Sequence, residues 1–205
     1  MLHESGYEPF LPFHAPRSRL GVATLARSTL VTNSIQSLRT RGLYRRYAMH
    51  LDADDEAALS TAVAGVWIPI DVAVAHYEAC EALRLGVGQQ LDIALEVGQH
   101  VHGTLLRAML RLARTAGVTP WAALAYSGTL YARLFQGGGI EVTRTGPKDA
   151  RVDMVGNPLC DIEYFRVGVR GVYESALEHF SRRVVTQEIP WRRVGLEMSL
   201  RISWV

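Results

Sequence analysis

The residues of this sequence best suited to chemistry are its histidines and cysteines. His76 and Cys80 are four residues apart, so on a helix their side chains would share one face and could contact one metal ion. A zinc site needs three or four such ligands, and the sequence offers no second pair at ligand spacing. We therefore expect no metal, and we interpret the pair as a partly buried histidine beside a small apolar thiol.

A second pair of histidines, His100 and His102, lies in a helical pattern. Residues two apart on a helix diverge by about 200°, so these two side chains cannot hold one ion together. Each of them, like His76, is in principle an axial ligand for haem. The Cys-x-x-Cys-His motif for haem attachment is absent. We expect no cofactor, with haem kept as the alternative.

The patterns that usually mark catalysis are also incomplete. Gly137-Gly138-Gly139 precedes a strand pattern, whereas phosphate-binding loops run from a strand into a helix, so we interpret it as a helix-to-strand joint. Ser127 has neither a Gly-x-Ser-x-Gly context nor a partner base. Asp161 and Glu163 stand at a helix start, where they are expected to cap the helix. A non-catalytic protein is therefore favoured over an enzyme.

The composition places the chain among ordinary globular proteins. It has 205 residues, of which 48% are hydrophobic and 20% charged, enough for one domain with a core and too apolar for disorder. No apolar run approaches the roughly 20 residues of a membrane span. The first residues lack the basic start and apolar stretch of a signal peptide. We expect a cytoplasmic protein with both cysteines reduced.

Arginine is concentrated near the N-terminus, where residues 1–51 hold seven arginines and two acidic residues. Guanidinium groups pair well with phosphates, so such a segment could bind nucleic acid. No interleaved aromatic platform accompanies these arginines, and we do not expect a nucleic-acid partner.

Residue periodicity divides the chain into an arm and one domain. Residues 1–24 form an extended arm rich in proline and arginine, and residues 25–205 form a single α+β domain of the ligand-binding type. Within this domain the pattern indicates a short strand at Arg27–Val31, a helix capped by Asn33, and further helices at Ile70–Leu85, Val87–Ala116, Trp121–Phe135 and Asp161–Arg182.

The period changes from helical to alternating after Gln136. Alternation predicts strands at 139–145, 150–156, 183–190 and 195–204, which pair as two hairpins separated by a long helix. We therefore predict an α+β fold, with a helical layer packed on one face of an antiparallel sheet. Helix faces that carry Trp121, Tyr126 and Tyr131, together with the apolar arm, predict at least a homodimer.

Several short segments, spread over about residues 25–205, form a recognisable combination. They are Arg41–Tyr44 with Arg46-Tyr47, Gly65–Pro69, Ala75–Cys80, Val101–Thr104, Gly117–Trp121, Phe135–Gly139, Gly146–Val152, Tyr164–Arg166 and Arg201–Trp204. Together they resemble an uncharacterised domain family expanded in gliding, fruiting delta-proteobacteria.

That family is distantly similar to the superfamily of haem-NO-binding sensor domains, 4-vinyl-reductase-type domains and transport-particle subunits of Golgi traffic. The resemblance implies a helical layer on an antiparallel sheet and an apolar pocket between them. Haem-NO-binding domains carry a Tyr-x-Ser-x-Arg motif that is absent here, and the cysteine pairs of the vinyl-reductase type are absent too.

We therefore predict a non-catalytic small-molecule-binding or sensory module for signalling. Its apolar pocket is expected between the Ile70–Leu85 and Val87–Ala116 helices and the sheet, and its ligand is expected to be an apolar small molecule. The candidate lining residues are His76, Tyr77, Cys80, His102, Leu106 and Phe165. In the alternative function, the chain is a structural or assembly protein that docks on a protein partner or oligomerises through its arm and helices.

Overall fold

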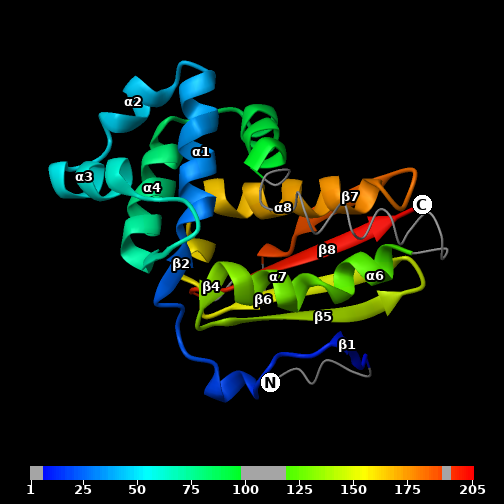
Figure 1. Ribbon diagram of the computed structural model, residues 1–205. Coiled ribbons are helices and arrows are strands. Elements are labelled where there is room, and N and C mark those ends of the chain that lie inside the picture. Colours follow the sequence, from blue (N-terminus) through cyan, green and yellow to red (C-terminus); the bar gives the residue numbers. More distant parts are fainter. Residues whose placement is uncertain (1–6, 98–118, 191–194) are drawn as a thin grey trace.

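The centre of the fold is an antiparallel sheet of five strands in the order β1-β5-β6-β8-β7 (Figure 1). The computed structural model describes residues 7–97, 119–190 and 195–205. The strands span Pro9–Leu11 (β1), Gly139–Gly146 (β5), Asp149–Val155 (β6), Val184–Glu188 (β7) and Met198–Trp204 (β8). The two predicted hairpins are β5–β6 and β7–β8, and the α+β prediction is confirmed.

Two helices with amphipathic sequence patterns pack on this sheet. The long helix between the hairpins is α8, Glu163–Glu178, which packs against β7, while α7, Ser127–Leu134, packs against β5. The predicted helix Trp121–Phe135 is divided at Tyr126, because a short helix α6, Pro120–Ala125, ends before α7 begins.

A group of helices extends beyond one end of the sheet (Figure 1). It comprises α1 (Ser28–Thr40), α2 (Tyr44–Ala48), α3 (Ala53–Thr61) and α4 (Ile70–Ala82). Residues 87–97 are also helical. Asp52 accepts a hydrogen bond from the Asp55 backbone N–H at 2.8 Å and caps α3.

A second, small sheet connects this helical group to the rest of the chain. It contains β2 (Leu25–Arg27) between β3 (Trp67–Pro69) and β4 (Phe135–Gln136). The prediction of a strand at Arg27–Val31 and a helix cap at Asn33 is wrong, because α1 begins at Ser28. Ser28 fixes that start by donating its backbone N–H to Val66 O at 2.9 Å and its hydroxyl to Val63 O at 2.7 Å.

The triple glycine forms a tight joint between β4 and β5. Gly137 and Gly138 have φ angles of 93° and 64°, which favour glycine. The Gly138 N–H donates to Gly21 O at 2.7 Å, and a Cβ on Gly138 would stand 2.2 Å from the Tyr131 hydroxyl. The joint thus brings together the arm, α7 and the main sheet.

The arm covers the aromatic surface that motivated the prediction of a dimer. Its strand β1 pairs with β5, and the Phe10 ring lies 5.0 Å from Trp121, which in turn lies 4.9 Å from Trp204. Tyr131 is buried. The homo-oligomer therefore stays a prediction, and these aromatic residues no longer argue for it.

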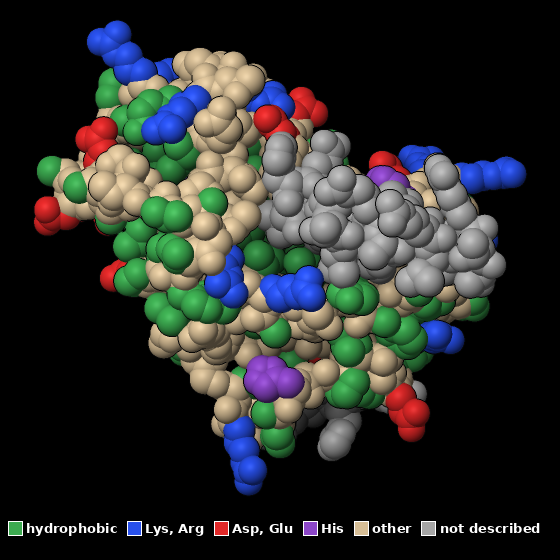
Figure 2. Space-filling view, in the orientation of Figure 1, with side chains coloured by type: hydrophobic (Ala, Val, Ile, Leu, Met, Phe, Trp, Pro, Cys, Tyr) green, Lys and Arg blue, Asp and Glu red, His purple; other side chains and the backbone are tan. Residues whose placement is uncertain are grey.

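Several arginines of the N-terminal third are engaged within the chain. On the face shown in Figure 2, basic and acidic side chains are interspersed rather than gathered by sign. The contacts are Arg17 with Glu197, Arg27 over the Trp67 ring, Arg39 over Tyr44, Arg41 with Glu96, and Arg46 with Leu83 O. Among the helices described, none has the length and hydropathy needed to cross a bilayer.

Candidate functional site

An apolar cavity of about 150 Å³ lies between the helices and the main sheet. Its wall combines α1, α4, residues 87–97, α6, α7 and α8 with Ile140 of β5 and Met154 of β6. The remaining described lining residues are Leu30, Ser34, Tyr77, Gln90, Ile93, Ala94, Val97, Ala123, Tyr126, Ser127, Leu130, Tyr131, Leu134, Phe135, Tyr164, Phe165, Gly168, Val169, Val172, Tyr173, Ala176 and Leu177. None of these described residues carries a charge.

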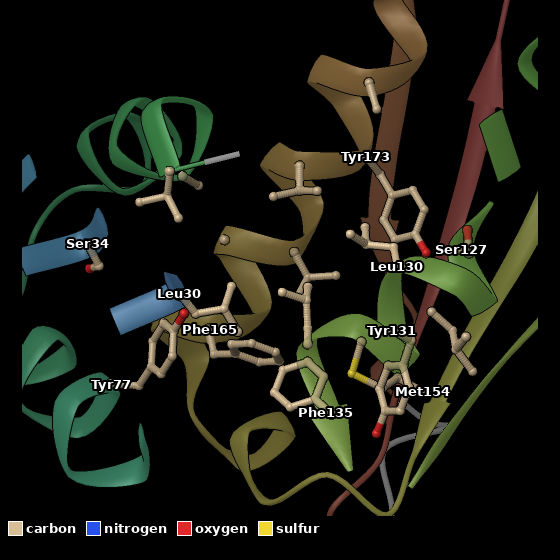
Figure 3. Close-up of a pocket in the computed structure, with 18 of the residues that line it drawn as sticks. Leu30, Ser34, Tyr77, Ser127, Leu130, Tyr131, Phe135, Met154, Phe165 and Tyr173 are labelled. Atoms are coloured by element: carbon tan, nitrogen blue, oxygen red, sulfur yellow. The ribbon is translucent and has the colours of Figure 1, made fainter. Parts of the chain in front are cut away.

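Aromatic rings form one wall of the cavity (Figure 3). The Phe165 ring lies 5.2 Å from Tyr77 and 6.3 Å from Phe135, both in edge-to-face geometry. Such pairs are attractive and resist rotation of the individual rings. The sequence folds this way because the start of α8 brings Phe165 against α4 and β4 at once.

The far side of the cavity holds a satisfied pair of hydroxyl groups. Figure 3 shows Tyr173 of α8 directed toward Ser127 of α7. Burial raises the pKa of Tyr173 to about 12, and a hydrogen bond with Ser127 partly offsets this effect. The nearby Tyr131 hydroxyl donates to Gly137 O at 3.1 Å.

The opposite side of the cavity holds three buried polar atoms that make no hydrogen bond to a nitrogen or oxygen atom. They are Ser34 Oγ, Tyr164 Oη and Gln90 Oε1. Ser34 and Tyr164 are only 2% and 5% exposed. The neighbour that both hydroxyls face is the Cys80 thiol, a weak hydrogen-bonding group. Burial raises the pKa of this thiol, and the two hydroxyls lower it to a smaller extent.

His76 lies behind this wall in a fully buried contact with Tyr47. Its Nδ1 is 2.7 Å from the Tyr47 hydroxyl, and its Nε2 is 3.7 Å from Cys80 Sγ. Burial lowers the pKa of His76 to about 3. The imidazole is therefore neutral at physiological pH, and its ring nitrogens already face partners within the core.

The structure distributes the six predicted lining residues among three places. Tyr77 and Phe165 line the cavity. His76 and Cys80 are buried on the same helix, in the layer beside it. His102 and Leu106 lie outside the described residues.

Sequence reasoning missed the contribution of α6 and α7 to the cavity wall. Tyr126, Leu130 and Leu134 line it, and they follow one another at intervals of four residues. This spacing is a helical stripe that the sequence does show. From sequence alone the aromatic residues of that segment predict an oligomer surface, because periodicity does not say what covers a helix face.

Metal ligands do not converge in the part of the chain that the structure describes. No group of three or more His, Cys, Asp or Glu side chains there could hold an ion. Cys80 and Cys160 are both buried free thiols.

No protein-family model and no curated protein sequence matches this chain. Solved structures do match. The unliganded Fe(II) H-NOX protein from K. algicida superposes with a TM-score of 0.59 at 12% identity, covering 87% of this chain and 96% of its own. A variant of that protein gives a TM-score of 0.61 at 11% identity and the same coverage.

The chain has an H-NOX-like fold. A third structure, from work on haem distortion in the H-NOX family, gives a TM-score of 0.54 at 15% identity over 87% of this chain and 94% of its own. The fold agrees with the distant relation to haem-NO-binding domains that the sequence indicates. The narrower resemblance, to a family of fruiting delta-proteobacteria, stays a prediction.

The expectation that no cofactor is involved is contradicted by these comparisons. The neighbours include H-NOX proteins with iron in the Fe(II) state and proteins studied for their haem distortion. The expectation rested on the missing Tyr-x-Ser-x-Arg and Cys-x-x-Cys-His motifs. Short motifs of this kind can be absent from a chain that still shares the backbone arrangement.

The side chains of the described cavity wall suit a haem chemically, but the cavity is too small to hold one. Its apolar and aromatic side chains suit the faces of a porphyrin, and Met154 and Tyr131 carry the thioether and phenol groups that can ligate haem iron. A cavity of about 150 Å³ matches a benzene-sized molecule, and drug-sized ligands need roughly 300 Å³ or more. A porphyrin would therefore require the helices around the cavity to separate.

Proposed function

We propose that this chain is a sensory domain whose apolar cavity between α7, α8 and the main sheet is its ligand site. The observation that carries the proposal is the cavity itself, because close-packed protein interiors contain few voids larger than a water molecule. A cavity lined by residues from six helical segments and three strands is also well placed to transmit a change of occupancy to the surface.

Haem is the first candidate ligand, since the solved structures with this fold include haem proteins. Bound haem would supply an iron centre that coordinates a further small molecule. The chain's own residues, Phe135 and Phe165 among them, would supply apolar contacts to the ring. Met154 carries the one thioether among the described lining residues, and this group could ligate the iron.

A smaller apolar molecule is the second candidate, and the volume of the cavity favours it. A cavity of about 150 Å³ lined by aliphatic and aromatic side chains is of the size that binds benzene. Both candidates use the same wall, so one set of variants tests both.

The test is a pair of substitutions at Gly168, which lines the cavity on α8. A Cβ at this position would meet only Ala94 Cβ, at 3.9 Å, so Gly168→Ala is accommodated and leaves most of the cavity open. Gly168→Leu adds three further carbon atoms beside the cavity and is expected to fill it.

Ferric haem is titrated into both variants and the unaltered protein, and its Soret absorption is followed. We expect a shifted Soret band at one equivalent for the unaltered protein and Gly168→Ala, and its loss for Gly168→Leu. Toluene binding is measured in the same three proteins by isothermal titration calorimetry. If the unaltered protein binds neither probe, or Gly168→Leu binds them equally well, the proposed function is wrong.

A further inference from the structure

The helices α6 and α7 separate the cavity from the N-terminal arm. On α6, Ala123 lines the cavity, while the ring of Trp121 lies 5.0 Å from the ring of Phe10 in the arm. Residues two apart on a helix diverge by about 200°. The arm and the cavity therefore lie on opposite sides of α6.

The same arrangement recurs on α7. Leu130 lines the cavity, and Gly128, two residues earlier, faces the arm. A Cβ on Gly128 would stand 3.3 Å from Leu11 Cδ2, so the leucine lies directly against the helix backbone. A cavity offers few atoms to pack against, so the position of α6 and α7 depends on what holds their outer side.

A cation reinforces the contact between the arm and α6. The Arg144 guanidinium of β5 lies 4.2 Å from the centroid of the Trp121 ring and 5.4 Å from that of Phe10. Such contacts within about 6 Å are attractive. The Trp121 indole also donates its N–H to Pro147 O at 3.2 Å. The arm thus covers the side chain that attaches α6 to the β5–β6 hairpin.

The arm itself is held by contacts that can open locally. Its strand β1 has three residues and pairs with β5 at two positions, with a register shift between them. Pro9 of β1 has no backbone N–H to donate. In the described part of the arm, none of residues 7–22 is fully buried. Segments with few buried contacts open at a lower free-energy cost than the core does.

We propose that the arm sets the size of the molecule that the cavity admits. With Phe10 and Leu11 in place, the arm holds α6 and α7 close to α8, and the cavity accepts a molecule of single-ring size. When the arm leaves the edge of the sheet, the two helices move outward and the cavity admits a neutral apolar molecule of two or three rings. This inference rests on the proposed function, because it takes the cavity to be the ligand site.

The test compares toluene with N-phenyl-1-naphthylamine, a neutral dye of three rings whose fluorescence rises in apolar surroundings. Phe10→Ala with Leu11→Ala removes the two arm side chains that contact α6 and α7. We expect this variant to bind the dye roughly tenfold more tightly than the unaltered protein, because a larger fraction of its molecules is open. Its affinity for toluene should change less than about threefold, and saturating toluene should displace the dye. Leu11→Ala alone should strengthen dye binding about threefold, and it serves if the double variant does not fold.

A matched control removes one phenylalanine and one leucine from another part of the arm. Phe13 and Leu20 pack at Gly139 of β5, where a Cβ would stand 3.1 Å from each side chain. Phe13→Ala with Leu20→Ala leaves the contacts with α6 and α7 in place, so the affinity for the dye should change less than about threefold. The inference is overturned if both double variants bind the dye equally tightly, or if toluene does not displace it.

Hydrogen exchange of the ligand-free proteins, followed by mass spectrometry, gives a second readout. Backbone amides of residues 120–134 should exchange faster in Phe10→Ala with Leu11→Ala, while those of α8 keep the rate of the unaltered protein. Equal acceleration in both segments would contradict the proposed movement. If toluene binds and the arm variants leave dye affinity unchanged, only this inference is wrong. If the unaltered protein binds neither toluene nor haem, the proposed function fails and the inference fails with it.

Discussion

The hydroxyl oxygen of Tyr47 lies 2.7 Å from Nδ1 of His76, and both side chains are fully buried. The contact joins α2 to α4 and places a neutral imidazole in the core. Protonation of His76 would place an uncompensated charge there, since the other groups around it are the Tyr77 ring and the Cys80 thiol. The fold therefore depends on this histidine staying neutral.

A pH dependence of stability follows from that relationship. Burial lowers the pKa of His76 from 6.5 to about 3, so the unfolded chain binds a proton that the folded chain does not. The contribution of His76 to stability is complete above pH 6.5 and is lost as the pH falls toward 3. Between pH 7 and pH 5 we expect the free energy of unfolding to fall by about 2 kcal/mol from this group.

Urea unfolding at both pH values measures this effect, with His76→Asn as the control. The Asn Oδ1 can accept from Tyr47 in place of Nδ1 and does not titrate. The difference in the free energy of unfolding between the unaltered protein and His76→Asn should be about 2 kcal/mol smaller at pH 5 than at pH 7. Parallel pH profiles for the two proteins would show that His76 is not the group responsible.

The glycine joint predicts a strong local effect of a single methyl group. In Gly138→Ala the new Cβ would lie 2.2 Å from Tyr131 Oη and 2.7 Å from Val155 O, in a backbone conformation with φ of 64°. We expect a loss of at least about 2 kcal/mol in the free energy of unfolding. Gly86→Ala, whose Cβ would meet nothing within 4 Å, should change stability by less than about 0.5 kcal/mol. Equal effects in denaturant unfolding would contradict this account of the joint.

Two glycines on α8 offer a matched comparison next to the cavity. Gly168→Ala should raise stability by up to about 1 kcal/mol, because alanine favours the helix and the new Cβ makes only an ordinary contact. In Gly171→Ala the Cβ would lie 3.1 Å from Leu91 Cδ2 and 3.3 Å from Ala94 Cβ, so the crossing of α8 with residues 87–97 must open slightly. A melting temperature that rises less for Gly171→Ala than for Gly168→Ala is the expected result, and the reverse order would refute the packing described.

Arg166 is a buried cation that joins three segments. Its Nη1 donates to Cys160 O and Asp161 O at 3.0 Å each, and its Nε lies 3.0 Å from Glu188 Oε1 on β7. Arg166→Ala would leave the Glu188 carboxylate, which is largely buried, without its partner, and we expect a loss of about 3 kcal/mol. Arg201→Ala removes an exposed pair with Asp149 and should cost less than about 1 kcal/mol. Thermal unfolding of both variants measures the contrast.

The elements that sequence reasoning predicts well are those with a long, regular period. The strand ending at Trp204 alternates buried Met198, Leu200 and Ile202 with the exposed Arg201, and its face assignment follows directly from the sequence. The helix α8 and the hairpin β5–β6 are predicted from the sequence for the same reason, because each has a regular period.

Short strands with distant partners could not be predicted. The three residues of β2 pair with Trp67–Pro69 on one side and with Phe135 and Gln136 on the other. A segment of that length carries no measurable period, and its partners are fixed only by the tertiary structure. The start of α1 at Ser28 depends on the same contacts, which is why a cap at Asn33 was the wrong prediction.

The candidate site was accessible to sequence reasoning only in part. Tyr77 and Phe165 belong to apolar helical stripes, so their inward orientation follows from spacing. The approach of the Ser34 and Tyr164 hydroxyls to the Cys80 thiol depends on the relative positions of α1, α8 and α4, about which the sequence says nothing. The distant similarity to haem-NO-binding domains comes from short sequence segments, and the solved H-NOX structures, at 11–16% identity, agree with it.

Methyl NMR of the protein labelled at its methionine methyl groups tests the central claim most directly, because Met154 lines the cavity and Met49 is 74% exposed on the helical end. Saturating toluene, whose ring current shifts nearby protons, should move the Met154 signal and leave the Met49 signal in place. The shift of Met154 should disappear in Gly168→Leu. An unmoved Met154 signal, or equal shifts of Met154 and Met49, would contradict the assignment of this cavity as the ligand site.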